Sequence, residues 1–259
     1  MPGPLRWENA RRAPRAAPTA GRRNQPPGKG FRYTDGPPTS RVLMTDPVLR
    51  ITEIFYSLQG ESSTTGLPTV FVRLTGCPLR CSYCDTAYAF QGGSSQSLTE
   101  VLAAVAQYRA SHVTVTGGEP LAQRESLALL QALCDRGYRV SLETSGALPV
   151  TEVDPRVHII LDIKTPASGE VSRNLWANLV HLGAKDEIKF VICDRADYEW
   201  SRLQLDRHRL ADSGAELLFS PAQGRVEPRV LAEWILADRL PVRMQVQLHK
   251  ILWGDSPGR

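Results

Sequence analysis

Short apolar runs recur along the chain and are separated by polar or helical segments. The first, Ile51–Ser57, alternates apolar and polar residues as a half-buried strand does. Runs of similar length follow at Val70–Leu74, His112–Thr116, Arg139–Leu142, His158–Leu161, Glu187–Ile192, Glu216–Phe219 and Val242–Leu248. Between them, Leu98–Ala110 has apolar residues three and four positions apart, which predicts an amphipathic helix, and a second helix is expected over Gln123–Asp135.

Strands that alternate with helices predict an α/β fold with a parallel sheet. Two connections, Ala147–Val157 and Thr165–Leu182, are too short or irregular for a full helix. Polar groups follow the carboxyl ends of the runs, where α/β folds collect their active sites. We therefore predict an incomplete (β/α)6 partial TIM barrel over residues 46–259, with some crossover helices missing.

Residues 1–45 have a different character. They are rich in Arg, Pro, Ala and Gly, show no hydrophobic periodicity, and so predict a disordered N-terminal extension. Their basic residues account for the net charge of +4, and the remainder is near neutral or slightly acidic. A nucleic-acid-binding arm, an organelle transit peptide and a misassigned start are open interpretations. We favour a natural start at Met44, which leads directly into the first strand.

The composition of 42% hydrophobic and 22% charged residues is typical of a globular protein. No apolar run approaches the roughly 20 residues that span a bilayer, so a membrane protein is not expected. Unpaired cysteines, odd in number, favour the reducing cytoplasm. The body lacks basic patches interleaved with aromatic residues, which argues against direct nucleic-acid binding.

Three cysteines carry the strongest chemical signal. Cys77, Cys81 and Cys84 have C-x3-C-x2-C spacing and directly follow the second apolar run. Cysteine thiolates bind iron–sulfur clusters, and three of them leave one iron of a 4Fe-4S cluster without a protein ligand. Structural zinc is the competing interpretation, but it generally takes four Cys or His ligands, whereas Cys134 and Cys193 stand alone.

This spacing resembles the cluster motif of the radical S-adenosylmethionine superfamily. In that superfamily the open iron binds the amino and carboxylate groups of S-adenosyl-L-methionine. Gly117-Gly118-Glu119-Pro120, at the end of an expected strand, is similar to the superfamily's second motif. Its glycines allow a ligand to approach the backbone, and Glu119 can accept hydrogen bonds from an ammonium group. The resemblance implies a 4Fe-4S cluster and S-adenosyl-L-methionine as cofactors.

Further motifs narrow the resemblance to the 7-carboxy-7-deazaguanine synthase family. They are Phe55-Tyr56-Ser57-Leu58-Gln59-Gly60-Glu61, Phe71-Val72-Arg73-Leu74, Cys84-Asp85-Thr86, Glu143-Thr144-Ser145-Gly146 and Gln247-Leu248-His249-Lys250. The likeness extends from Ile51 to Leu252. That family converts 6-carboxy-5,6,7,8-tetrahydropterin to 7-carboxy-7-deazaguanine, a ring contraction with loss of ammonia in queuosine and deazapurine biosynthesis.

The resemblance implies a role for each matching residue. The cluster would be held by Cys77, Cys81 and Cys84, and Thr86 would help to bind magnesium, a hard cation that prefers oxygen ligands. S-adenosyl-L-methionine would contact Tyr83, Cys84, Asp85, Gly118, Glu119, Asp162, Ile163, Lys164, Ser220, Pro221, Ala222 and Gln223. The pterin would contact Leu58, Gln59, Gly60, Arg73, Thr116 and His249. Arg73 would form a bidentate pair with its carboxylate.

The sequence pattern alone, without the resemblance, gives some of these residues a less specific interpretation. By this interpretation Gln59 and Glu61 are solvated loop residues, and His249 is a surface histidine at the end of the last strand. Asp162-Ile163 stands where many family members have Ser-Pro. The segment Trp253–Arg259 exceeds the usual end of short members, so no role is carried over to it.

Two other functions stay open at this point. A glycyl-radical activating enzyme has the same cysteine spacing but acts on a protein backbone. A non-catalytic metal-binding module could use the basic arm on RNA, with salt-dependent affinity. The family resemblance implies a homodimer that receives electrons from a donor such as flavodoxin.

Overall fold

The computed structural model describes residues 46–254, 256 and 258. The predicted disordered extension over residues 1–45 lies outside the described residues.

The described residues form a mixed sheet in the order β3-β1-β2-β4-β5-β6-β7-β8-β9. The strands are β1 (Val48–Leu58), β2 (Pro68–Leu74), β3 (Ser94–Ser97), β4 (His112–Gly117), β5 (Arg139–Thr144), β6 (His158–Ile163), β7 (Glu187–Ile192), β8 (Glu216–Pro221) and β9 (Arg243–Met244). β1 runs antiparallel to β2 and β3, whereas every pair from β2 to β9 is parallel. The α/β class with a mostly parallel sheet is therefore confirmed.

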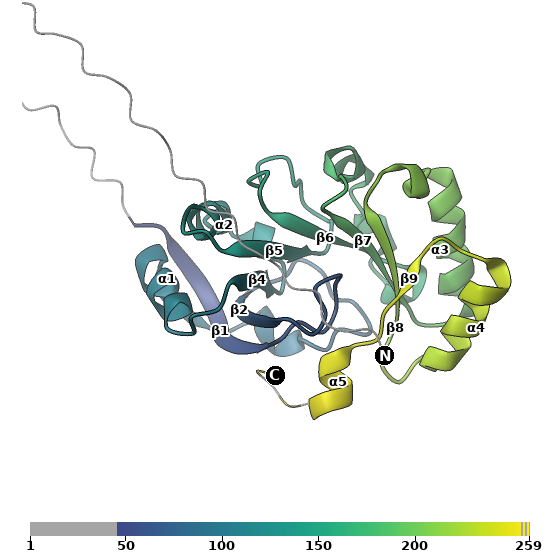
Figure 1. Ribbon diagram of the computed structural model, residues 1–259, viewed down its shortest axis with the longest axis horizontal. Coiled ribbons are helices and arrows are strands. Elements are labelled where there is room, and N and C mark those ends of the chain that lie inside the picture. The colour runs from purple at the N-terminus through teal and green to yellow at the C-terminus, as the bar shows by residue number, and fades with distance from the viewer. Residues whose placement is uncertain (1–45, 255, 257, 259) are drawn as a thin grey trace, which may run out of the picture. The chain divides into compact units, whose positions relative to one another are not determined.

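The helices are unevenly distributed along the sheet (Figure 1). They are α1 (Leu98–Ala106), α2 (Ser126–Asp135), α3 (Arg195–Arg207), α4 (Pro228–Asp238) and α5 (Leu248–Trp253). As predicted, the β5–β6 connection has no helix, and the β6–β7 connection has only the 3-10 turns Pro166–Ser168, Val171–Arg173 and Trp176–His181. None of the helices in the described ranges is long and apolar enough to cross a membrane.

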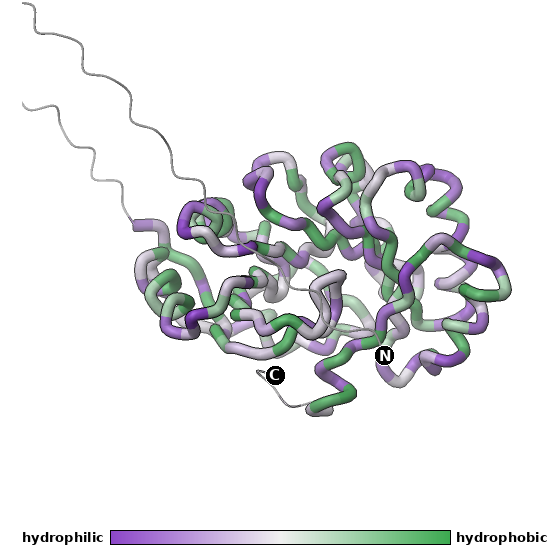
Figure 2. The backbone as a smooth tube through the Cα atoms, viewed as in Figure 1, coloured by the Kyte–Doolittle hydropathy of each residue, from purple (hydrophilic) through white to green (hydrophobic). Residues whose placement is uncertain are grey.

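The strands separate apolar and polar side chains onto opposite faces because successive side chains of a strand point in opposite directions. One face packs into the core with the helices, through pairs such as Val113 and Val115 on β4. The other face is more polar and carries Thr114 and Thr116 of the same strand. Figure 2 marks the apolar stretches of the strands in green. This second face is available to build a site.

The predicted last strand, Val242–Leu248, is wrong over most of its length. The ladder covers only Arg243–Met244, and α5 begins at Leu248. The Gln245 amide still donates to Phe219 O of β8 at 3.0 Å, while its Nε2 atom donates to the carbonyl of Ser62 at 2.7 Å. Beyond Gln245 the chain turns to the loop that follows β1, and the Leu248 amide donates to Gly60 O at 3.1 Å. His249 consequently lies in the first turn of a short helix.

Candidate functional site

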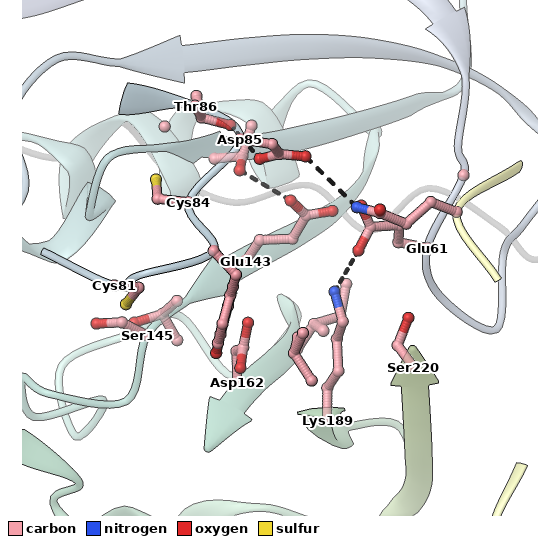
Figure 3. A pocket seen from close by; sticks show the side chains of 18 of the residues that line it. Glu61, Cys81, Cys84, Asp85, Thr86, Glu143, Ser145, Asp162, Lys189 and Ser220 are labelled. Carbon is pink, nitrogen blue, oxygen red and sulfur yellow. Dashed lines mark hydrogen bonds and ion pairs between the residues drawn. The ribbon is translucent and has the colours of Figure 1, made fainter. Parts of the chain in front are cut away.

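A single pocket brings the predicted site residues together. It lies on the polar face of the sheet and is lined from β1, β2, β4 to β8, the cysteine loop and α5. All of the predicted site residues line it except Ile163 and Glu119. Its charged and sulfur-bearing members from separate strands and loops converge in Figure 3.

The cysteine loop joins β2 to a 3-10 turn at Ala87–Phe90. All three cysteines are half-buried and line the pocket, whereas Cys134 and Cys193 are buried outside it. Burial raises the pKa of Cys81 to about 11, and the Lys164 ammonium opposes this rise. A three-thiol set beside a cation, with no fourth cysteine in the pocket, suits a cluster that keeps one iron open.

Residues of the β6–β7 connection hold this loop in place. Ser82 donates its amide to Ser168 O at 3.0 Å and its hydroxyl to Ala167 O at 2.6 Å. The Arg80 amide donates to Glu170 Oε1 at 2.6 Å. The connection is fixed in turn by the buried carboxylate of Asp197, which accepts from the Ala167 amide at 2.9 Å.

Gly118 allows a close crossing of two backbones beside the cysteines. A Cβ atom at this position would lie 2.1 Å from Gly76 O and 2.8 Å from the Cys77 Cβ. Glu119 is fully buried and accepts hydrogen bonds from Thr144 Oγ1 at 2.9 Å and the Ser145 amide at 2.7 Å. Its carboxylate thus supports pocket-lining residues, and its predicted contact with an ammonium group stays a prediction.

The end of β6 presents alternate side chains to the pocket. Asp162 and Lys164 line it, with Lys164 Nζ 3.0 Å from Asp162 Oδ2 and 5.9 Å from the centre of the Tyr83 ring. Ile163 points to the opposite face and lies in the hydrophobic core, so its side chain cannot contact a cofactor in this pocket. The buried Asp162 Oδ1 and the Tyr83 hydroxyl have no hydrogen-bond partner among the described residues. These two atoms provide polar contacts for a ligand.

The loop after β1 crosses the polar face instead of lying in solvent. Gln59 is 2% exposed, and its Nε2 atom donates to Thr114 Oγ1 and Glu143 Oε1, both at 3.2 Å. At the far side of the loop, the Ser63 amide donates to Glu187 Oε1 at 2.9 Å. The loop therefore forms one wall of the pocket, and the solvated reading of Gln59 is wrong.

Glu61 of this loop forms an ion pair with Lys189 of β7 (Figure 3). Burial alone would raise the pKa of Glu61, but the Lys189 ammonium and the Gln247 amide, 2.8 Å from Glu61 Oε1, lower it to about 2. Lys189 is 9% exposed, and despite its burial the facing carboxylates raise its pKa. The pair is charged at neutral pH, and the solvated reading of Glu61 is also wrong.

Glu143 of β5 lies between this ion pair and the cysteines in Figure 3. It accepts a hydrogen bond from Thr116 Oγ1 at 2.8 Å. Burial and the nearby Glu61 carboxylate raise the pKa of Glu143. Each carboxylate oxygen of Glu143 accepts one hydrogen bond, from Gln59 or Thr116, and Glu143 forms no ion pair with another described residue.

Arg73 of β2 also lines the pocket and forms a cross-strand ion pair. Its Nε donates to Glu53 Oε1 at 2.6 Å, and the Tyr88 hydroxyl donates to the same oxygen at 2.8 Å. The guanidinium carbon lies 5.7 Å from the centre of the Phe55 ring. Burial lowers the pKa of Arg73, but the nearby tyrosine and glutamate raise it overall, so Arg73 stays cationic.

A possible cation position lies near Thr86, whose hydroxyl donates to Asp85 Oδ1 at 2.8 Å. Glu61, Asp85 and His249 each offer one ligand atom there, and these atoms lie within 4.8 Å of one another. The sequence analysis expected a magnesium ligand only at Thr86; it assigned Asp85 to S-adenosyl-L-methionine and His249 to the pterin, and gave Glu61 no role.

Sequence reasoning also gave no role to Glu143, Lys189 or Gln247. The first two occupy strand positions two residues from another polar position, Ser141 and Glu187, in otherwise apolar strands. Polar residues at every second position of a strand could have identified them, because such residues lie on the same face of the sheet. Gln247 lies in the motif Gln247-Leu248-His249-Lys250, but no polar periodicity around it indicates a role.

Comparison with known proteins agrees with this geometry. Residues 71–162 match the Radical SAM superfamily. The chain is 49% identical over 217 residues to the 7-carboxy-7-deazaguanine synthase of Chlorobaculum tepidum, covering 83% of this chain and 98% of that protein. It is 45% identical to the Koribacter versatilis protein of that name, covering 79% of this chain and 97% of the relative.

A structural neighbour supports the same assignment. QueE from Escherichia coli aligns with a TM-score of 0.64 and 26% identity, over 78% of this chain and 95% of that one. The superfamily match identifies the cofactors as a 4Fe-4S cluster and S-adenosyl-L-methionine, as the three cysteines indicated. The chain belongs to the 7-carboxy-7-deazaguanine synthase family of radical S-adenosylmethionine enzymes.

Proposed function

We propose that this enzyme converts 6-carboxy-5,6,7,8-tetrahydropterin to 7-carboxy-7-deazaguanine. One observation carries the proposal: Arg73, Gln59 and Glu143 line the same pocket as the three cysteines. A carboxylated pterin needs a cation for its carboxylate and paired donors and acceptors for its ring edge, and this pocket supplies both. The product would enter queuosine or other deazapurine biosynthesis.

Each end of the pocket has a separate task in this proposal. Cys77, Cys81 and Cys84 would hold the cluster, and the Gly118 backbone with Lys164 would border S-adenosyl-L-methionine. Bound together, these cofactors would supply the radical chemistry that removes hydrogen from the substrate. Further contacts to S-adenosyl-L-methionine would come from the pocket-lining residues Tyr83, Asp85, Asp162, Ser220, Pro221, Ala222 and Gln223. Glu119 and Ile163 do not line the pocket; Ile163 could contribute only its backbone, and Glu119 would act as the acceptor for the amino group of the cofactor.

The remaining residues would orient the pterin. Arg73 would bind its carboxylate, while Leu58, Gln59, Gly60, Thr116 and His249 complete the walls. Glu143 would accept hydrogen bonds from the N–H groups of the ring, because it carries an acceptor without a paired cation. Holding the reacting carbon in one place and excluding water is the protein's share of such radical chemistry.

Magnesium would bind beside Thr86 in this scheme. The hydroxyl of Thr86 and the carboxylate of Asp85 are hard oxygen donors, and a substrate carboxylate would complete the set. Such an ion would fix the orientation of the substrate during the rearrangement.

Several assembly properties belong to the same proposal. The sheet would act as an incomplete (β/α)6 barrel, since its polar face lines the pocket from β2 to β8. We infer a homodimer in the cytoplasm that receives electrons from a donor such as flavodoxin. Neither a membrane nor direct nucleic-acid contact has a part in it.

Anaerobic reconstitution with iron and sulfide tests the function. The holoenzyme is incubated with reductant, S-adenosyl-L-methionine, Mg²⁺ and carboxytetrahydropterin, and the products are identified by mass spectrometry. We expect 7-carboxy-7-deazaguanine in wild type and none with Cys81→Ala. Methionine and 5'-deoxyadenosine without the deazapurine would refute the substrate while leaving the cofactor assignment intact.

A further inference from the structure

Arg73 donates its hydrogen bond to Glu53 from the Nε atom of the guanidinium group. Its Nε atom donates to Glu53, and among the described residues neither Nη atom has a hydrogen-bond partner. A guanidinium group has five N–H donors in a rigid plane. Fixing Nε therefore fixes the direction of the Nη1–Nη2 edge, which is left for a ligand of the pocket that Arg73 lines.

Glu53 is itself held from two directions. It faces Arg73 directly across the antiparallel β1–β2 ladder, and its Oε1 atom accepts from both Arg73 and the Tyr88 hydroxyl. Burial and the adjacent Glu53 raise the pKa of Tyr88 to about 12, even though Arg73 opposes this, so Tyr88 stays a donor at neutral pH. Glu53 does not line the pocket, and thus acts only through Arg73.

We propose that Glu53, held by Tyr88, is a positioning residue that aims the Nη edge of Arg73 and so sets selectivity for carboxylated over uncarboxylated pterins. This inference rests on the proposed function for its ligand. The opposite possibility is that Glu53 competes with the ligand as a counter-ion. The two roles predict opposite effects when Glu53 is removed.

Two substitutions separate these roles. Glu53→Ala removes the acceptor, so the guanidinium loses its orientation and one of its two charge-assisted bonds to the ligand carboxylate. We expect the ratio of affinities for 6-carboxypterin and pterin to fall about tenfold. Glu53→Gln keeps an oxygen acceptor for Nε and for Tyr88, and should keep the wild-type ratio within about threefold.

The measurement is fluorescence titration of the reconstituted holoenzyme with each pterin, at one pH and ionic strength. Glu216→Ala is the matched control, because Glu216 accepts from Arg243 Nε at the same distance of 2.6 Å and neither residue lines the pocket. The control should leave the ratio unchanged. An unchanged ratio in Glu53→Ala, tighter binding of 6-carboxypterin, or an equal loss in Glu53→Gln would overturn the proposal.

Crystal structures of the variants provide a readout that needs no pterin. The guanidinium plane of Arg73 should be displaced in Glu53→Ala and unchanged in Glu53→Gln. If wild-type enzyme fails to prefer 6-carboxypterin, the proposed substrate is wrong, and the position of Arg73 alone decides the role of Glu53. An undisplaced Arg73 in Glu53→Ala would then reject it.

Discussion

Replacing Lys189 by methionine should destabilise the enzyme strongly at neutral pH and much less at mildly acidic pH. The substitution keeps the length of the side chain but leaves the Glu61 carboxylate in the pocket without its cation. The neighbouring Gln247 amide and His249, whose Nε2 lies 3.9 Å from Glu61 Oε1, remain. They cannot replace a direct ammonium contact.

The size of the effect follows from the pKa of Glu61. Although burial opposes ionisation, Lys189 and its neighbours lower this pKa from 4.5 to about 2, and such a difference corresponds to roughly 3 kcal/mol. Breaking one partner of a buried pair typically costs about 3–5 kcal/mol, which agrees. A loss of about 3 kcal/mol should lower the apparent Tm by roughly 6–12 °C in a domain of this size.

The pH dependence has a defined sign. A carboxyl group with a lowered folded pKa stabilises the protein above its unfolded pKa near 4.5, and this contribution disappears as pH falls toward 2. Without Lys189, burial dominates and the pKa of Glu61 rises above its ordinary value instead. Glu61 can then take up a proton on mild acidification, so the deficit of Lys189→Met should shrink as pH falls from 7 toward 5.

Thermal unfolding of the holoenzyme at a fixed scan rate, followed by circular dichroism at several pH values, measures this effect. Lys189→Met/Glu61→Gln should recover most of the lost stability, because no unpaired charge stays buried. Arg229→Met is the matched control: its pair with Glu233 at 2.9 Å is exposed, and should contribute at most about 0.5 kcal/mol. The reasoning is refuted if Lys189→Met equals wild type at pH 7, or if the double variant is no more stable than the single one.

Three further substitutions probe the pocket. Gly118→Ala places a Cβ against rigid backbone of the cysteine loop, so we expect a loss of about 1–3 kcal/mol in unfolding free energy and of bound iron, and wild-type iron content would contradict this. Gly60→Ala brings a Cβ within 2.5 Å of His249 Nδ1, in a movable side chain, and 3.2 Å from the His249 amide nitrogen. KM for the pterin should therefore rise, and Tm should fall by less than in Gly118→Ala. Gly183→Ala, where nothing lies within 4 Å of the added Cβ, should change neither. Glu143→Gln should raise KM about tenfold at unchanged Tm. Because the pKa of Glu143 is raised by burial and by a like charge, wild-type affinity should fall on acidification at a higher pH than for an ordinary glutamate, and a pH-independent affinity would argue against its contact with the ring.

The sequence predicted β1, β2, β4 to β8 and the cysteine loop, because these depend on local information. It did not predict β3, Ser94–Ser97, which contains no apolar residue. Apolar runs of strand length and a short motif need no knowledge of distant residues. The end of the chain could not be predicted in this way. The pattern of Val242–Leu248 predicts a strand, but the Gln245 side chain and the Leu248 amide bond to the loop after β1, and the chain turns out of the ladder beyond Gln245. Such partners are nearly two hundred residues apart in sequence, and no local pattern records them.

The site was predicted unevenly for a related reason. Family motifs selected both Asp162 and Ile163, although the alternation of a strand allows only one of two neighbours to face the pocket. The same alternation would have selected Lys189 and Glu143, which no motif assigned a role. Motifs give the position of a site along the chain, whereas the alternation of side chains along a strand shows which of them face the site.

The missing helix between β6 and β7 has a functional consequence. In an α-helix the carbonyl groups of Ala167 and Ser168 would accept bonds from within the helix. In the 3-10 turn found here they accept instead from Ser82, between the second and third cysteines. Asp197 makes this arrangement stable, since its buried carboxylate accepts from the Thr165 hydroxyl and the Ala167 amide, both at 2.9 Å. The connection therefore lacks helical hydrogen bonds and instead makes bonds that hold the cysteine loop. The irregularity that interrupts the alternation of strands and helices thus also keeps the three cysteines in position.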